Sequence, residues 1–184
     1  MTILYTLTST RPNTGHPFHS KDSSGLPCVT TYQNAIDNLV SANAMTQDVT
    51  LSDDQLTRTV VLTFKDLTVF TQYYNLLTDF ELGKEFANNI KADGYRHARS
   101  LDTIDTPFTA TVTYTFPAGS AVDPSLIFDM TYGGYSTVNT TENSIVFTYS
   151  IENGIKFDKT IIDDPDVRAP LIANNISRNY VFSV

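Results

Sequence analysis

Two histidines, His16 and His19, lie three residues apart in the segment GHPFH. Imidazole nitrogens are common ligands of transition metals, so this spacing could supply two ligands of a metal site. However, the intervening proline breaks the helix that would direct both rings at one ion, and no cysteine pair or third histidine is nearby. We therefore expect a loop here and no bound metal.

Three acidic residues, Asp163, Asp164 and Asp166, surround a proline in the segment IIDDPDVRAP. Such a cluster could ligate calcium or supply the paired carboxylates of a hydrolase. Calcium loops usually add a glycine and a closing glutamate, which do not follow here. Glycosidase carboxylates come from separate elements and are not identified by proximity in sequence. We expect a solvated acidic turn.

Other catalytic and cofactor signatures are missing from the sequence. No serine lies in a G-x-S-x-G elbow, and His97 sits between an arginine and an alanine, which indicates a solvated side chain. Gly133-Gly134 lacks the lysine and the following helix of a phosphate-binding loop. Cys28, the single cysteine, has no basic neighbour that would lower its pKa. We expect no catalytic, cofactor-binding or metal-binding residues and no cofactor.

Exposed tyrosines are the remaining candidates for binding. Tyr132 and Tyr135 flank the Gly-Gly turn, where they could stack on sugars or anchor an interface. Tyr73 and Tyr74 are adjacent in a segment with helical spacing, so we expect one in the core and one at its edge.

The composition limits the class of protein. The net charge is −8 over 184 residues, which opposes direct nucleic-acid binding. No apolar run approaches the roughly 18 residues of a membrane-spanning helix, and the first residues do not read as a signal peptide. A single cysteine cannot form an intrachain disulfide, and a chain of this length does not need one to fold.

The first half, residues 1–94, is predicted to contain strands and helices. The expected elements are a strand over 3–9, a long loop over 11–27, a helix from Thr30 or Thr31 to Ala44, a polar turn over 46–54, a strand over 57–64 and a helix that extends to about residue 90. Val60, Leu62 and Phe64 should face this last helix, for which Asp66 or Thr68 is the expected cap.

Residues 95–106 are predicted to be a linker, and residues 107–184 a β-rich half. The expected strands cover 108–116, 126–132, 144–151, 155–161 and 176–184, with a hairpin turn at Asn153-Gly154. The predicted fold class is α+β, with a strand and helix half packed against a mainly antiparallel half. One continuous domain is the alternative to two.

An internal echo links the two halves. TLTSTRP and TRTVVLTF in the first half resemble TVTYTFP and SIVFTYS in the second. A duplication would explain the echo, and so would a shared threonine-rich strand composition.

The segments MTILYTLTSTRP and LTRTVVLTFKDLTVFTQYYN resemble small, threonine-rich structural proteins of tailed bacteriophages, of the type found in marine and cyanobacterial phages. The resemblance covers the N-terminal half only. It implies a virion component that works by assembly, with no cofactor and no catalytic residues.

We therefore predict a non-enzymatic structural component of a phage virion, in its tail, baseplate, neck or capsid surface, made in the host cytoplasm. Its expected partners are copies of itself and other virion structural proteins, with no direct nucleic-acid or membrane contact. Strand addition at 176–184 is the expected mode of assembly. A carbohydrate or host-receptor binding module is the alternative, and a hydrolase with dispersed carboxylates a further one.

Overall fold

The computed structural model describes residues 3–16, 18, 27–78, 94, 96–103, 107–128, 137–151, 171 and 173–184. Its elements are β1 (Ile3–Thr10), α2 (Pro27–Ser41), β2 (Met45–Leu51), β3 (Thr57–Phe64), α3 (Leu67–Thr78), β4 (Arg96–Thr103), β5 (Phe108–Thr115), α5 (Ser125–Phe128), β6 (Thr137–Thr140), β7 (Ser144–Ile151) and β8 (Ser177–Ser183). The strands form two four-stranded antiparallel sheets, and helices accompany them, so the predicted α+β class is confirmed.

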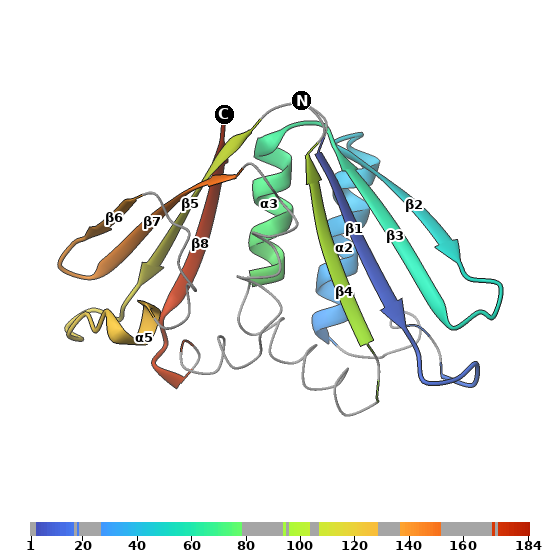
Figure 1. Ribbon diagram of the computed structural model, residues 1–184, viewed down its shortest axis with the longest axis horizontal. Coiled ribbons are helices and arrows are strands. Elements are labelled where there is room, and N and C mark those ends of the chain that lie inside the picture. The colour runs from blue at the N-terminus through green and yellow to red at the C-terminus, as the bar shows by residue number, and fades with distance from the viewer. Residues whose placement is uncertain are drawn as a thin grey trace.

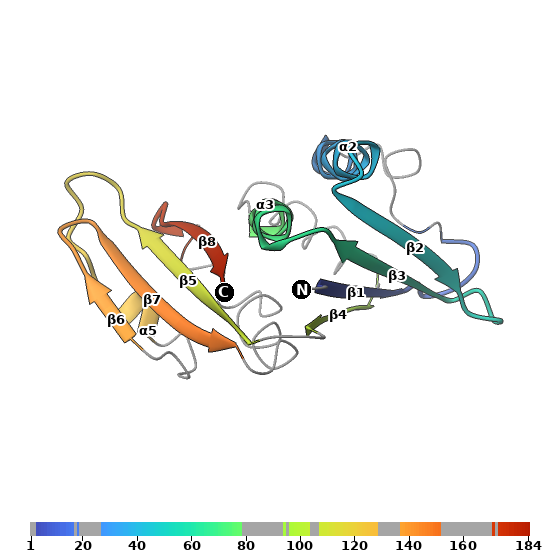
Figure 2. The same cartoon turned by 90° about the horizontal axis from the view of Figure 1, so that it is seen from above.

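The first sheet has the strand order β2-β3-β1-β4, and the chain runs through it as β1-α2-β2-β3-α3-β4. This is the β-α-β-β-α-β arrangement of ferredoxin-like folds. Both helices lie on the same face of the sheet (Figure 2). The other face carries the alternate, partly exposed residues of the two central strands, most of which are threonines.

The second sheet repeats the strand order of the first, as β6-β7-β5-β8 (Figure 1). The pairing registers also correspond. In the first sheet Thr10 pairs with Thr57 on one side and Arg96 on the other, and in the second Thr115 pairs with Ser144 and Ser177. The two sheets therefore share their strand order and their register.

The sequence echo falls on equivalent strands of this repeat. TLTSTRP belongs to β1 and the residues after it, and TVTYTFP to β5 and the residues after it. TRTVVLTF and SIVFTYS are in β3 and β7. Beyond the strands the same backbone hydrogen bond recurs, from Arg11 to Leu56 and from Phe116 to Asn143, each at 2.9 Å. The echo thus corresponds to a structural repeat.

Helix α3 begins where its sequence predicts. The Asp66 carboxylate accepts a hydrogen bond from the backbone N–H of Val69 at 2.9 Å, which satisfies a free donor of the first turn. Phe70, Tyr73 and Tyr74 then fall on the buried side of the helix and are all 0 % exposed. The expectation that one of the two adjacent tyrosines lies at the edge of the core is wrong, because α3 is covered on two sides.

Those two sides are the first sheet and strand β8 of the second, and α3 lies between them (Figure 2). Toward the first sheet, Tyr73 packs edge-on against Tyr5 with ring centres 5.8 Å apart. Toward β8, the ring of Phe70 is 4.8 Å from that of Phe182, and the ring of Tyr74 is 4.9 Å from that of Tyr180. One helix therefore joins both sheets into a single aromatic core.

The backbone of β8 is also bonded to α3. The side-chain amide of Asn75 donates to the Tyr180 carbonyl and accepts from the Tyr180 N–H, both at 2.8 Å. The Thr71 hydroxyl accepts from the Phe182 N–H at 3.2 Å. The β8 strand forms as predicted, but α3 covers its outer edge at these residues, which removes the site proposed for strand addition.

Several predicted elements need correction. The predicted linker over 95–106 contains β4, which pairs with β1 along its whole length. The predicted polar turn over 46–54 contains most of β2. The helix α2 begins at Pro27 rather than at Thr30 or Thr31. Residues 125–128, which overlap the strand predicted over 126–132, form the short helix α5. The hairpin at 153–154, the strand over 155–161 and the helical continuation over 79–90 lie outside the described residues.

Candidate functional site

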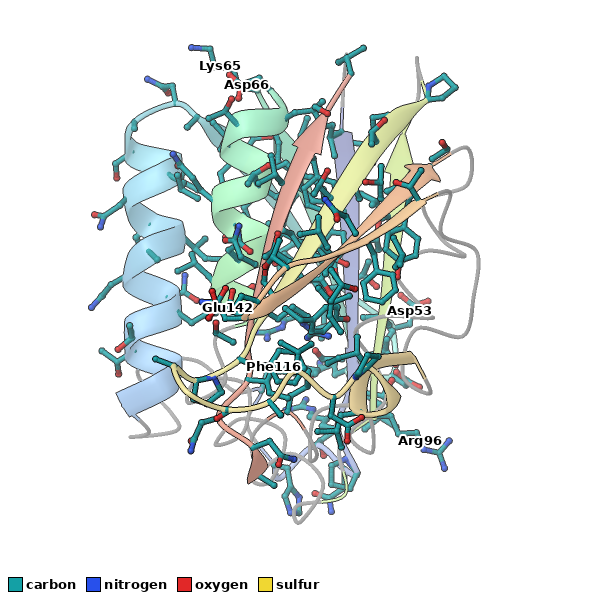
Figure 3. The ribbon with its side chains drawn as sticks, turned by 90° about the vertical axis from the view of Figure 1, so that its left-hand side faces the viewer. Asp53, Lys65, Asp66, Arg96, Phe116 and Glu142 are labelled. Carbon is teal, nitrogen blue, oxygen red and sulfur yellow. The ribbon has the colours of Figure 1, made fainter. Side chains whose placement is uncertain are left out.

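The candidate site lies at the end of the first sheet where β1 finishes and β3 begins. Arg58 lies in β3 opposite Ser9 of β1, and Arg11 follows β1 directly. Arg96 opens β4 and pairs with Thr10, so it belongs to the same end of the sheet. Lys65 lies at the opposite end, near the start of α3 (Figure 3). Three arginines thus gather at one end of a chain whose net charge is −8.

Arg11 is held in place by the turn between β2 and β3. Its backbone N–H extends the ladder by donating to the Leu56 carbonyl at 2.9 Å. Its Nε donates to the Gln55 carbonyl at 2.8 Å, and its Nη1 donates to the His16 carbonyl at 2.9 Å. Among the described residues these side-chain bonds use two of the five N–H donors of the guanidinium group.

The loop after Arg11 is closed by Asn13. The Asn13 side-chain oxygen accepts from the Gly15 N–H at 3.0 Å and lies 2.9 Å from the Nδ1 atom of His16. Such bonds from an asparagine to the backbone two residues on are typical of tight turns. The loop therefore folds back over the β2–β3 turn, and its next described residue, Phe18, reaches the two arginines.

Phe18 contacts both guanidinium groups. The guanidinium carbon of Arg11 lies 4.7 Å from the ring centre, and that of Arg58 lies 5.0 Å from it. The face of an aromatic ring attracts a cation at this distance. The ring therefore contacts two positive charges, which repel each other.

Burial adds to the electrostatic cost of this arrangement. Removal of Arg58 from water lowers the pKa of its guanidinium group, although an arginine stays charged at neutral pH. The carboxylate of Asp54, in the same turn, accepts through its Oδ1 atom from the Ser52 hydroxyl at 2.6 Å and from the Leu56 N–H at 2.9 Å. These bonds lower the pKa of Asp54, the one from Ser52 most. An anion placed between the two arginines would lower their repulsion.

The second sheet shows that the fold does not require arginines here. Phe116 occupies the position of Arg11, and Ile145 occupies that of Arg58, as the shared register shows. Phe116 is 4 % exposed and Ile145 is 0 % exposed. Equivalent positions are thus filled by apolar side chains in one repeat and by two cations in the other.

A fourth arginine, Arg178 in β8, is buried in the second sheet and has its own partners. Its guanidinium carbon lies 5.4 Å from the centre of the Tyr180 ring. Burial alone would lower its pKa, but Tyr180 and Tyr114, which also hydrogen-bonds to it, raise the pKa overall. Arg178 therefore belongs to the core of the second sheet.

The residues singled out in the sequence do not form a site in the described structure. His16 is exposed and bonded to Asn13, and the described residues bring no three histidine, cysteine or acidic side chains together. His19, Asp163, Asp164, Asp166, Tyr132 and Tyr135 lie outside the described residues, as do the side chains of Cys28 and His97. None of the described helices is long and apolar enough to cross a lipid bilayer.

Comparison with known proteins adds little to this geometry. No family model matches the sequence, and no curated protein matches it. Among solved structures, the chain is similar to a "putative glycine cleavage system transcriptional repressor", with 9% identity, 100% of this chain and 98% of the other covered, and a TM-score of 0.28. At that score the likeness indicates nothing about a ligand or partner of this chain.

This comparison nevertheless corrects the prediction that the chain is a structural component of a phage virion, together with its alternative of a carbohydrate or receptor-binding module. The matched structure is described as a regulator of transcription, and none of these findings concerns a phage.

Proposed function

We propose that the protein is a non-enzymatic binding protein that recognises a small anion, carrying a carboxylate or phosphate group, at Arg11 and Arg58. The observation that carries this proposal is the exchange of these arginines for Phe116 and Ile145 in the second repeat. An apolar pair fills the equivalent space, so two adjacent cations are an electrostatic cost that folding alone does not require. A bound anion would offset that cost.

The chemical class of the ligand follows from the guanidinium group. Its planar fork of N–H donors matches the oxygen pairs of carboxylate and phosphate, and such charge-assisted bonds are among the strongest in proteins. Phe18 contacts both guanidinium groups, so a single ligand at this ring could reach either of them.

Titration with inorganic phosphate and with malonate tests the proposal. Both are added at constant ionic strength, with chloride as the reference anion, and the free energy of unfolding is measured. A ligand at about 100 times its Kd should raise that free energy by about 2.7 kcal/mol. Phosphate or malonate should stabilise the wild-type protein more than chloride does.

Arg58→Ile and Arg11→Phe supply the residues of the second repeat, so both variants should fold. We expect each to lose the ligand-dependent stabilisation. The matched control is Lys65→Gln, which removes one positive charge at the far end of the sheet. This variant should keep the ligand-dependent stabilisation. Equal stabilisation of Arg58→Ile and the wild type by both anions, or no stabilisation of the wild type beyond that by chloride, would refute the proposal.

A further inference from the structure

The outer edge of the first sheet is a long exposed strand. In β2, Met45 is buried, and the six residues that follow are exposed on both faces of the sheet. Two of them are large and apolar: Val49 is 54 % exposed and Leu51 is 48 % exposed. An exposed edge strand with apolar side chains is a ready template for pairing with another strand.

The direction of the free backbone groups in β2 can be read from the hydrogen bonds at its two ends. Lys65 N–H donates to the Ala44 carbonyl, and Ser52 N–H donates to the Thr57 carbonyl, each at 2.9 Å. Alternate residues of an antiparallel strand bond to the same neighbour. Every second residue of β2 between Ala44 and Ser52 therefore bonds to β3. The residues between them, Gln47, Val49 and Leu51, direct their N–H and C=O groups away from the sheet.

The edge at β8 is covered, whereas the edge at β2 is open, as is β6, the strand equivalent to β2 in the second repeat. At β8, Asn75 and Thr71 of α3 bond to the outward backbone groups of Tyr180 and Phe182. At β2, the exposed fractions of Val49 and Leu51 show that their side chains are open to solvent.

Charge limits the ways in which this edge can meet an identical chain. Two copies with a net charge of −8 repel each other over most of their surfaces. The β2 strand carries one charged residue, Asp48, and the adjacent helix α2 also carries one, Asp37. The Asp37 carboxylate accepts a hydrogen bond from Gln33 within the helix at 2.9 Å. The edge formed by β2 and α2 therefore carries two acidic residues and no basic one, and a pair of copies must keep these carboxylates apart.

We propose that two copies of the chain pair through β2 in antiparallel orientation, with Val49 of one copy opposite Val49 of the other. In this register Gln47 lies opposite Leu51 of the second copy, so all the outward backbone groups in this stretch meet partners. Asp48 of one copy lies opposite Thr50 of the other, and the threonine hydroxyl can donate a hydrogen bond to the aspartate carboxylate. The register centred on Asp48 is disfavoured, because it places two carboxylates directly opposite each other. The pair forms one continuous eight-stranded sheet with α2 of each copy on the same face.

Cross-linking tests both the pairing and its register. In a background with Cys28→Ser, which removes the single native cysteine, Val49→Cys should form a disulfide-linked dimer on mild oxidation. Residues opposite each other in a hydrogen-bonded pair have Cα atoms about 5.5 Å apart, within the range that a disulfide bridges. Asp48→Cys should cross-link far less. Efficient cross-linking of Asp48→Cys and not of Val49→Cys would overturn the register, and cross-linking of neither would overturn the pairing.

Sedimentation equilibrium tests the unmodified protein. The wild type should dimerise reversibly, and Val49→Lys should shift it to the monomer by placing two ammonium groups on the two-fold axis. The matched control is Val181→Lys, at a valine of similar exposure, 49 %, on β8, and it should remain dimeric. Val49→Pro removes an N–H that the monomer does not use for its sheet, so it should fold and stay monomeric. A monomeric wild type at all concentrations, or dimers of Val49→Lys as tight as the wild type, would overturn the proposal.

Discussion

The contact between Asn75 and β8 allows a quantitative test of how the two sheets are joined. Asn75→Ala removes two hydrogen bonds of 2.8 Å and leaves the N–H and C=O of Tyr180 without these partners. Tyr180 is 0 % exposed, so both groups lie away from solvent. Each unsatisfied buried group costs about 1–3 kcal/mol. A water molecule that enters the vacated space recovers part of this. We expect a loss of about 2–4 kcal/mol in the free energy of unfolding.

Urea denaturation measures this loss, and hydrogen exchange locates it. The amide of Tyr180 should lose protection in Asn75→Ala, while amides of the first sheet should lose no more than the global change in stability requires. Gln72→Ala, an exposed position of the same helix, is the control and should stay within about 0.5 kcal/mol of the wild type. Asn75→Asp should be destabilised at neutral pH and recover as its carboxyl protonates and becomes a donor. A change below about 0.5 kcal/mol in Asn75→Ala would refute the idea that α3 holds β8.

Three other perturbations test separate features. Phe70→Ala should lower the free energy of unfolding by about 3–5 kcal/mol in urea titrations, because its ring fills the core between both sheets. Asp66→Ala should cost about 0.5–2 kcal/mol through loss of the helix cap, whereas Thr68→Ala, which is exposed, should cost less. The Asp54 carboxyl should titrate below 3.8 in NMR, because bonds from Ser52 and its own turn favour the ionised form. Because the folded-state pKa of Asp54 is lowered, its carboxylate contributes stability at pH values above 3.8, and this contribution is lost as the pH falls through the folded-state pKa. Asp54→Asn should remove this pH dependence.

The sequence predicts those elements whose two faces differ. Over most of their length β1, β3, β5, β7 and β8 alternate between buried and partly or fully exposed residues, and each coincides with an expected strand. Helix α3 was predicted because its aromatic residues recur at helical spacing. Strand β2 gives no such signal, because nearly all of its residues are exposed. In β4, RHARSLDT has few apolar residues to alternate, and only its pairing with β1 makes it a strand.

The candidate site has no local signature. Arg11 and Phe18 are in one loop and Arg58 is in a strand far along the chain, and the antiparallel pairing of β1 with β3 brings them together. The internal echo offered one usable signal. Once TLTSTRP is aligned with TVTYTFP, Arg11 falls opposite Phe116, which marks a charged residue where the repeat has an apolar one.

The two repeats keep the same sheet and differ where contacts to other molecules are possible. In the second repeat, Phe116 and Ile145 pack in the core, so this end of the sheet serves folding. In the first repeat, Arg11 and Arg58 occupy the equivalent end, where Phe18 contacts both guanidinium groups. Because the second repeat demonstrates apolar packing at the same positions, the two arginines are not a requirement of the fold. The first repeat is therefore the part of the chain in which ligand binding should be sought, and variants that copy the second repeat into it are the least disruptive way to remove that binding.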